Sequence, residues 1–295
     1  MNLEQETKYI LKKYGISANK NLGQNFLINE EAVDKIIEGA NICREDLVIE
    51  IGPGLGTLTK ELLERAGKVI AVELDKRMIH ILKDRFKLYD NFELINDDIL
   101  KIDLKRIINE SLSKNPNTEY DDRKSEDIKH IKIVANLPYY ITTPIIMKLL
   151  EDKLNIDTIT VMIQKEVADR LIAIPGEKNT GAITYGVYYY SESSKITEVK
   201  RDSFIPEPNV DSEVIQLKIR REPPVTVTDT QLMFKIIKCA FLQRRKTLVN
   251  ALDSSGIFKN KDEIINILKA NNIDEKIRGE ALSMEEYAKI TNSIL

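Results

Sequence analysis

The first half of the chain alternates short apolar runs with longer segments whose apolar residues recur at helical spacing. Five such runs read as strands, at residues 47–51, 69–74, 92–95, 131–135 and 158–163. Strands that alternate with amphipathic helices are typical of a mainly parallel sheet covered by helices. The pattern therefore predicts an α/β, Rossmann-like domain.

The second half of the chain changes character. Runs at 183–190 and 213–219 lie close together without an obvious long helix between them, and we expect them to add an antiparallel pair to one edge of the sheet. After Pro223-Pro224 the pattern predicts helices at 229–241, 244–252, 261–270 and 284–295. We therefore expect one domain at 1–222 with an N-terminal arm and a small all-helical domain at 223–295. The polar stretch 109–129 predicts a surface loop.

Composition narrows the class of protein only slightly. The 295 residues suffice for a large and a small domain, and 44 Lys and Arg against 47 Asp and Glu neither require nor exclude a nucleic-acid partner. Cys43, Cys239, His80 and His130 lack the spacing of a metal site or a disulfide framework. Residues 1–14 are charged, and no run of about eighteen apolar residues occurs. We expect a cytoplasmic protein without a metal or a membrane partner.

A glycine-rich turn follows the first strand of the alternation. Gly52 and Gly54 lie in Glu-Ile-Gly-Pro-Gly-Leu-Gly-Thr, and Glu73 ends the next strand, where it can accept the hydroxyls of a ribose. Thr57 stands where the dinucleotide fingerprint has its third glycine. The spacing therefore favours S-adenosylmethionine, which has a ribose but no phosphate, over a dinucleotide. An ordinary tight turn is the alternative.

The third strand is followed by Asn-Asp-Asp-Ile at 96–99. Asp98 can accept the amine of a cofactor adenine, and Ile99 can pack on its ring. An Asp after a strand is also a common helix N-cap, and Asp98 can serve both purposes.

Asn136-Leu137-Pro138-Tyr139 follows the fourth strand and suits a flat base with an exocyclic amine. The Asn136 side-chain oxygen and the Leu137 carbonyl can accept the amine protons and localise its lone pair. Pro138 fixes φ and has no N–H donor, and Tyr139 offers a face for stacking. Such residues also form ordinary strand-to-loop turns.

Three further segments favour a functional interpretation of these motifs over ordinary turns. They are Asn-Leu-Gly-Gln-Asn-Phe-Leu at 21–27, Phe-Ile-Pro-Glu-Pro-Asn-Val-Asp-Ser at 204–212 and Phe-Leu-Gln-Arg-Arg-Lys-Thr-Leu at 241–248. From about Asn21 to the C-terminus, the ordered set closely resembles the ribosomal RNA adenine dimethyltransferase family. It is most similar to the branch that dimethylates two adjacent adenosines near the 3′ end of small-subunit (16S) rRNA during ribosome biogenesis.

The resemblance implies a Rossmann-like methyltransferase domain that uses S-adenosylmethionine, with the small ribosomal subunit and its rRNA as partner. We expect a monomer, although the sequence does not reveal the oligomeric state. It implies contacts to the methionine part of the cofactor from Asn25 and Leu27, and a second aromatic, Phe204, that closes on the flipped adenine opposite Tyr139. Asn136 is expected to face both cofactor and target. The alternative for Phe204 is an aromatic packed on the core. The 109–129 stretch departs from the family by looking longer than a compact connection.

A basic cluster lies between residues 231 and 250, which contain no acid. Its members are expected to neutralise RNA phosphates: Lys235, Lys238, Arg244, Arg245 and Lys246. A solvated helical face is the alternative. Lys12, Lys13 and Lys20 are expected to extend this surface.

Three rival functions remain open. The first is the related methyltransferase of a large-subunit adenosine that confers macrolide resistance, although residues 243–247 and 210–212 favour the small-subunit branch. The second is a non-catalytic ribosome assembly factor, against which the intact motifs argue. The third is a nicotinamide dehydrogenase, for which the chain offers no hydride-transfer site.

Overall fold

The computed structural model describes residues 1–113 and 128–294 and divides into two compact units. The first comprises Met1–Ala168 and Ser194–Ile219, and the second comprises Asp169–Ser193 and Arg220–Leu295. The return to the second unit at Arg220 lies close to the expected boundary at 222/223. The structure differs from the expectation at 169–193, which belong to the second unit, so the chain passes between the units more often than the sequence pattern indicates.

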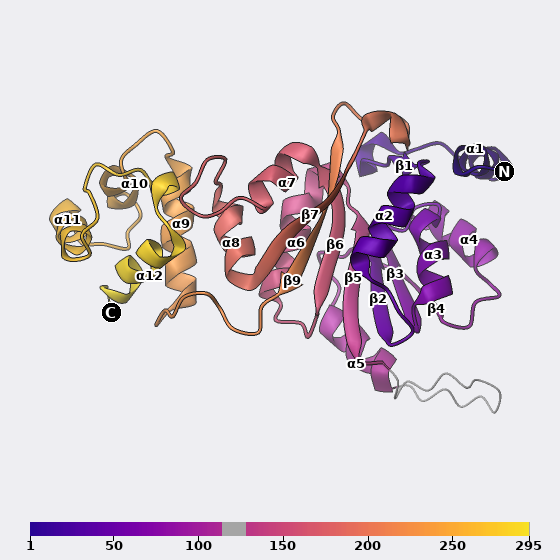
Figure 1. Ribbon diagram of the computed structural model, residues 1–295, viewed down its shortest axis with the longest axis horizontal. Helices are drawn as coiled ribbons and strands as arrows, with labels where there is room; N and C mark the ends of the chain where they lie inside the picture. The colour runs from indigo at the N-terminus through magenta and orange to yellow at the C-terminus, as the bar shows by residue number, and fades with distance from the viewer. Residues whose placement is uncertain (114–127, 295) are drawn as a thin grey trace. The chain divides into compact units, whose positions relative to one another are not determined.

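The first unit is built on a mainly parallel sheet (Figure 1). Within the described residues its seven strands have the order β4-β3-β2-β5-β6-β9-β7. Strands β4 to β6 run parallel, and β9 runs antiparallel to β6. The strands are β2 (Asp46–Ile51), β3 (Lys68–Glu73), β4 (Phe92–Asn96), β5 (His130–Asn136), β6 (Thr158–Gln164), β7 (Ser191–Val199) and β9 (Ser212–Ile219). The expected parallel sheet with an antiparallel edge is confirmed.

The register of the strands places their ends at a common edge. Ile51 of β2 lies opposite Val72 of β3 and Ala135 of β5. The next residues along the three strands are Gly52, Glu73 and Asn136, which therefore reach the same edge of the sheet. This edge is also where β2 has β3 on one side and β5 on the other, the topological switch point at which open α/β sheets bind ligands.

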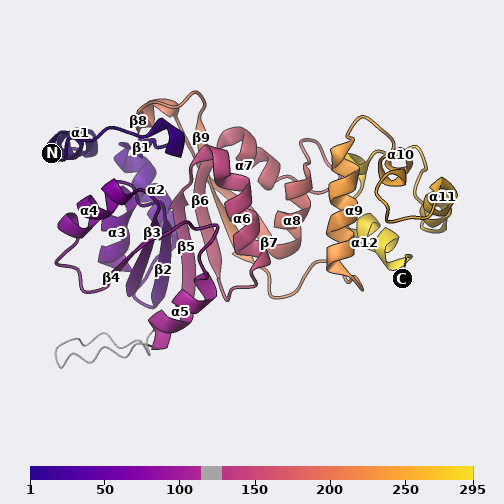
Figure 2. The same ribbon diagram turned by 180° about the vertical axis from the view of Figure 1, so that it is seen from behind.

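Helices cover both faces of this sheet, with α2 and α3 on one face and α6 on the other (Figures 1 and 2). Fully buried Ile36 of α2 and Leu62 of α3 pack with Val48 and Val69 of the sheet. Burying each such side chain stabilises the fold by roughly 1.5–3 kcal/mol. The helices are α1 (Leu3–Lys13), α2 (Glu30–Ala40), α3 (Thr57–Arg65), α4 (Lys76–Arg85), α5 (Leu104–Ser113), α6 (Thr142–Glu151) and α7 (Lys165–Leu171), the last of which crosses into the second unit.

Several short elements complete the first unit. Strands β1 (Phe26–Leu27) and β8 (Phe204–Ile205) form a separate antiparallel pair. The single-turn 3-10 helices here are η1 (Lys20–Leu22), η3 (Tyr139–Ile141) and η4 (Arg201–Ser203). The expectation of a surface loop at 109–129 is wrong for residues 109–113, which belong to α5. The greater part of this stretch, 114–127, lies outside the described residues.

The strand expected at 183–190 is wrong, because this segment is helix α8 (Ala182–Tyr190). Its β-branched and aromatic residues favour a strand locally. Helical spacing instead puts Tyr185 and Tyr189 on one face, four residues apart. The Tyr185 ring packs edge-on against Tyr287 at 5.1 Å, and its hydroxyl donates to the Leu282 carbonyl at 2.5 Å. Tertiary burial of the two tyrosines therefore overrides local propensity.

The second unit is helical. Its elements are α8, α9 (Thr230–Leu242), α10 (Leu248–Asp253), α11 (Lys261–Ala270), the 3-10 helix η5 (Gly279–Ala281) and α12 (Met284–Asn292). The helix expected at 244–252 begins only at Leu248, because Thr247 caps it and residues 244–247 form the preceding turn. In the part of the chain that is described, no helix has the length and apolar character needed to cross a membrane.

Candidate active site

A pocket lies at the carboxyl ends of β2, β3 and β5. It gathers most of the site residues that the sequence singles out, namely Asn25, Leu27, Gly52, Gly54, Glu73, Asp98, Ile99, Asn136, Leu137, Pro138 and Tyr139. Phe204 is not among its lining residues. The strands place these side chains at the sheet edge, and residues 22–27 supply a further wall.

The glycine turn at the end of β2 leaves room for a ligand. Gly52 has φ +67°, and a Cβ there would meet no protein atom within 4 Å, so the backbone is open to close approach. Gly56 has φ +86° and a different constraint, because a Cβ there would lie 2.4 Å from Cε2 of Phe86. The first glycine thus shapes the pocket, and the second allows α3 to pack closely.

Glu73 is held against this turn by backbone donors. Its Oε2 accepts from the Gly54 N–H at 3.1 Å, and its Oε1 accepts from the Asp75 N–H at 2.8 Å. The side chain is almost fully buried, and burial raises the pKa of Glu73. Each carboxylate oxygen retains acceptor capacity for a ligand hydroxyl.

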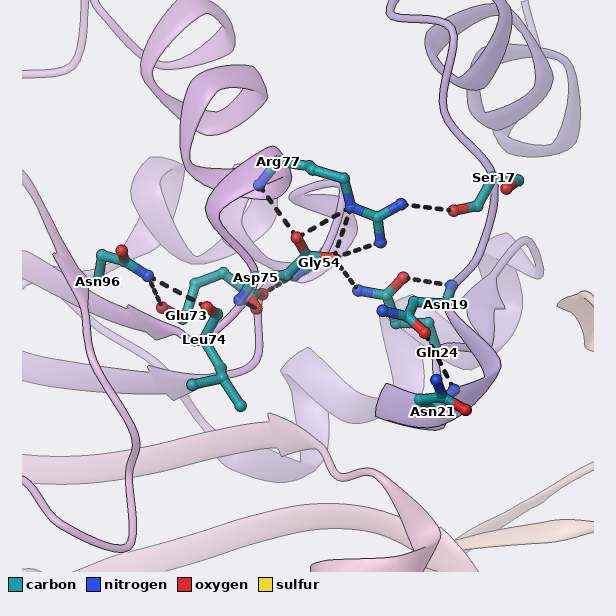
Figure 3. Close-up of polar contacts among 10 residues, drawn as sticks. All are labelled: Ser17, Asn19, Asn21, Gln24, Gly54, Glu73, Leu74, Asp75, Arg77 and Asn96. Atoms are coloured by element: carbon teal, nitrogen blue, oxygen red, sulfur yellow. Dashed lines mark hydrogen bonds and ion pairs between the residues drawn. The ribbon is translucent and has the colours of Figure 1, made fainter.

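Asp75 connects this acid to residues 17–25, here called the strap, whose last four residues line the pocket. The Asp75 carboxylate accepts from Nε2 of Gln24 at 2.9 Å and from Nη2 of Arg77 at 2.6 Å (Figure 3). Arg77 also donates to the Ser17 carbonyl at 3.4 Å, and the Asn19 N–H donates to Oε1 of Gln24 at 2.8 Å. Hydrogen bonding to Arg77 lowers the pKa of Asp75. The strap is therefore fixed to the end of β3.

Asp98 caps a turn rather than a helix and lines the pocket, and its expected contact with the cofactor adenine stays a prediction. Its Oδ1 accepts from the Leu100 N–H at 3.0 Å, so it caps the turn after β4. Its Oδ2 lies 3.5 Å from Nζ of Lys101, and the residue also lines the pocket beside buried Ile99. The capping bond orients the carboxylate without removing it from the pocket wall.

Asn136 is oriented by the strap. Its Nδ2 donates to the Asn25 carbonyl at 3.2 Å, which identifies Oδ1 as the side-chain atom left to accept from a ligand. The next residue is fixed by a bond from the Leu137 N–H to the Met162 carbonyl at 3.1 Å, while among the described residues no donor reaches the Leu137 carbonyl. Two acceptors, Asn136 Oδ1 and the Leu137 oxygen, therefore lie at one turn of the pocket.

The two aromatics predicted to hold the target base, Tyr139 and Phe204, differ in their position relative to the pocket. Tyr139 lines the pocket, its hydroxyl is 2.6 Å from Oγ of Ser212, and burial raises the pKa of Tyr139. Phe204 is only 3% exposed and packs in the hydrophobic core, in the β8 strand that pairs Phe204 with Leu27. The expected contact of Phe204 with a flipped adenine stays a prediction, because Leu27, its partner in the strand pair, belongs to the same core and still lines the pocket.

Glu50 is a pocket residue that sequence reasoning missed. It is 2% exposed, burial raises its pKa to about 8, and its Oε2 has no hydrogen-bond partner among the described residues. The signal in the sequence that could have identified Glu50 is an acidic residue within the otherwise apolar end of β2. Gln24, Asp75, Arg77 and Tyr140 were missed as well, because their roles depend on contacts between segments distant in sequence.

Comparison with known proteins decides the family. The family model described as ribosomal RNA adenine dimethylase matches residues 15–290. The chain belongs to the ribosomal RNA adenine dimethylase family. The family and the methyltransferase fold expected from the sequence are thereby confirmed.

Individual relatives agree with this membership of the dimethylase family. The chain is 48% identical to a Ribosomal RNA small subunit methyltransferase A of Clostridioides difficile, over 98% of this chain and 94% of that protein. It is 49% identical to the protein of the same name from Clostridium botulinum, over 98% of each. Among solved structures, a dimethyladenosine transferase from Plasmodium falciparum is similar, with a TM-score of 0.71 and 28% identity over 90% of this chain and 95% of that one.

The basic cluster of this dimethylase family member lies in the second unit. Lys235 and Lys238 are exposed on α9, and Arg245 and Lys246 are exposed in the turn before α10. Arg244 forms an ion pair within the protein, because its Nη2 lies 3.1 Å from Oε2 of Glu280.

The expected basic extension from the N-terminus belongs to the first unit. Lys12 and Lys13 are both exposed, and Lys13 forms an ion pair with Asp84 at 3.1 Å. Lys20 begins η1, and its side chain lies outside the description. Within the described ranges, no group of three His, Cys, Asp or Glu side chains is placed to hold a metal ion.

Proposed function

We propose that this chain transfers methyl groups from S-adenosylmethionine to N6 of two adjacent adenosines near the 3′ end of 16S rRNA. The observation that carries the proposal is the orientation of Asn136, whose Nδ2 bond to Asn25 presents Oδ1 beside the Leu137 carbonyl. These two acceptors match the two N–H donors of an adenine amine. They line the same pocket as Glu73, an acid suited to a ribose.

The residues of the pocket fit S-adenosylmethionine. In our proposal Glu73 accepts the ribose hydroxyls, and Asp98 with Ile99 holds the adenine. Asn25, Leu27, Gly52 and Gly54 surround the methionine part, and the open space over Gly52 admits a ligand directly against the backbone. Bound there, the cofactor supplies an electrophilic methyl group on its sulfonium.

The protein activates the amine by alignment. Asn136 Oδ1 and the Leu137 oxygen accept the two amine protons, which turns the nitrogen lone pair out of the ring system and toward the methyl carbon. The bound cofactor would supply the methyl carbon for the new nitrogen–carbon bond, and its sulfur would take the electron pair of the carbon–sulfur bond that breaks. The surplus proton on nitrogen then leaves to water. Tyr139 stacks on the base, which must be extruded from the folded RNA to reach the pocket.

The second unit contributes RNA binding in this proposal. Exposed Arg245 and Lys246, with Lys235 and Lys238, neutralise rRNA phosphates without reading sequence. Arg244 contributes less charge because of its pairing with Glu280. The fold of the small subunit supplies the remaining specificity. Because that subunit is the substrate, we place the reaction in the cytoplasm.

The test is methyl transfer from labelled S-adenosylmethionine to unmethylated small subunits, large subunits and naked rRNA, with mass mapping of the product. Dimethyladenosine at two adjacent positions of the small subunit is expected. The Asn136→Ala variant, which is expected to keep the fold, serves as the inactive control. Label in large-subunit RNA overturns the proposed substrate. No label anywhere, with subunit binding retained, overturns catalysis and identifies an assembly factor.

A further inference from the structure

Tyr140 is an aromatic side chain that the proposed chemistry leaves unused. Among the large apolar side chains that are exposed in the described residues, Leu74 and Tyr140 are the two that line the pocket. Leu74 follows β3 directly after Glu73, at the side where the cofactor is proposed to bind. Tyr140 follows Tyr139 in η3, at the side of the target base, and is 56% exposed.

The ring of Tyr140 is supported along one edge by the strap. A Cβ built on Gly23 would lie 3.2 Å from Cδ1 and 3.4 Å from Cε1 of Tyr140, so the ring packs against the bare backbone of this glycine. Pro138 flanks the same contact. In the described parts of the chain, the ring has no aromatic partner and its hydroxyl has no hydrogen bond. Tyr140 is thus a positioned ring with an accessible face.

Extrusion of a nucleotide leaves the adjacent base without a stacking partner, and an exposed aromatic ring can replace that partner. When the target adenosine leaves its stack, the adjacent base loses a stacking partner and exposes a face to water. A protein aromatic that replaces the lost partner recovers part of the unstacking free energy. Because Tyr140 is next to Tyr139 in sequence and lines the same pocket, it is placed for a base that is covalently next to the one on Tyr139.

We propose that Tyr140 forms a second nucleobase subsite, which stacks the base of the nucleotide adjacent to the target adenosine. This inference rests on the proposed function, in which that neighbour is the other substrate adenosine. Stacking uses the face of the base and leaves its amine free. The subsite therefore accepts the neighbouring adenine whether or not it already carries methyl groups.

Kinetics of three variants test the subsite. Stacking of one base corresponds to roughly a 5- to 150-fold effect on binding. Tyr140→Ala is expected to lower kcat/KM for small subunits within that range and to leave cofactor affinity unchanged. Tyr140→Phe keeps the ring and is expected to retain most activity. Tyr9→Ala is the matched control, because Tyr9 is also 56% exposed but lies outside the pocket.

A modified substrate measures the contribution of the neighbouring base separately. Small subunits are reconstituted with rRNA in which the nucleotide on the 5′ or the 3′ side of a target adenosine is abasic. Wild-type protein is expected to lose activity on one of these substrates, and Tyr140→Ala is expected to show no further loss there. Equal losses for both proteins on each substrate overturn the proposal. Wild-type turnover on unaltered subunits reports separately on the proposed function.

A fluorescence measurement does not require turnover. The chain has no Trp, so Tyr140→Trp introduces a single indole reporter at the subsite. Its emission is expected to be quenched when small subunits are added, and less so with the abasic substrate, whereas Tyr9→Trp stays unchanged. Unchanged Tyr140→Trp emission on saturated subunits contradicts stacking even if methyl transfer is normal.

Discussion

The side-chain amide of Asn136 donates to the backbone carbonyl of Asn25 across 3.2 Å, joining residues 111 positions apart. This bond ties the strap to the turn that presents the acceptors of the target amine. Replacement of Asn136 by Ala removes both the acceptor and this tie. Because alignment of the lone pair is the chief requirement of the reaction, we expect kcat to fall at least about 100-fold.

The control for Asn136 separates catalysis from folding. Thermal unfolding of Asn136→Ala is expected to stay within a few degrees of wild type, because the residue is only partly buried at the end of β5. Asn136→Asp cannot donate to the Asn25 carbonyl and is also expected to be strongly impaired. Normal turnover by the Ala variant contradicts the role assigned to Asn136.

The bonds from Gln24 and Arg77 to Asp75 predict a positioning role for this acid. Asp75→Ala frees the strap and removes the link through which the β3 end holds it. Hydrogen bonds to charged groups are worth about 1.5–3 kcal/mol, so we expect the KM for S-adenosylmethionine to rise about 10- to 100-fold. Gln24→Ala is expected to act in the same direction with a smaller effect. Steady-state kinetics with varied cofactor measures both.

Asp84 provides the matched control for Asp75. It also binds N-terminal residues, Lys13 and Tyr14, but neither of these lines the pocket, whereas Asp75 binds Gln24, which does. Asp84→Ala should therefore leave the cofactor KM near its wild-type value. Equal effects of the two substitutions would show that general attachment of the N-terminus, rather than the strap contact at the pocket, controls cofactor binding.

Buried Glu50 predicts that stability falls as pH rises from about 5 to 8. Its pKa is raised to about 8 in the folded protein by burial, whereas the unfolded chain ionises near 4.5. Between these values the folded state holds a proton that the unfolded state has lost, so the contribution is largest at low pH and is lost as pH rises toward 8. One such group changes the free energy of unfolding by up to about 1.4 kcal/mol per pH unit.

Glu50→Gln tests this linkage by urea unfolding at pH 5, 6, 7 and 8. The variant cannot ionise at this position, so its stability should decline less with pH and exceed that of wild type at pH 8. Some slope should remain, because burial raises the pKa of Glu73 in the same direction. Exposed Glu64 supplies the control substitution, Glu64→Gln. Parallel curves for wild type and Glu50→Gln would contradict the assignment.

The exposed cations before α10 predict salt-dependent binding. Double replacement of Arg245 and Lys246 by Ala is expected to weaken small-subunit binding and to lower the slope of log K against log salt by about 2, one for each lost phosphate contact. Arg244→Ala is expected to change the slope less, because Glu280 already shares its charge. Binding titrations between about 50 and 200 mM salt measure both. Lys269→Ala, on α11, is the control, and an unchanged slope in the double variant argues against phosphate contacts there.

The limits of sequence reasoning are clearest at 183–190 and Phe204. Residues 183–190 have the composition of a strand, and only packing of Tyr185 on Tyr287 makes them a helix. Phe204 lies in a motif that the resemblance links to the target base, and its burial in the strand pair β1–β8 is a tertiary feature that this motif does not encode. At 183–190 a local pattern allowed two outcomes, and contacts with distant residues selected one.

The sequence by itself determined the alternating strands and helices, the glycine turn and the acids and amide that end successive strands. These follow from periodicity and from chain-local chemistry, and parallel strands carry their ends to one edge. Only the tertiary structure decided that Asn25 orients Asn136, that Asp75 holds the strap and that Tyr140 stands exposed beside Tyr139. Such relationships depend on three-dimensional register and burial between segments far apart along the chain, which local spacing does not encode.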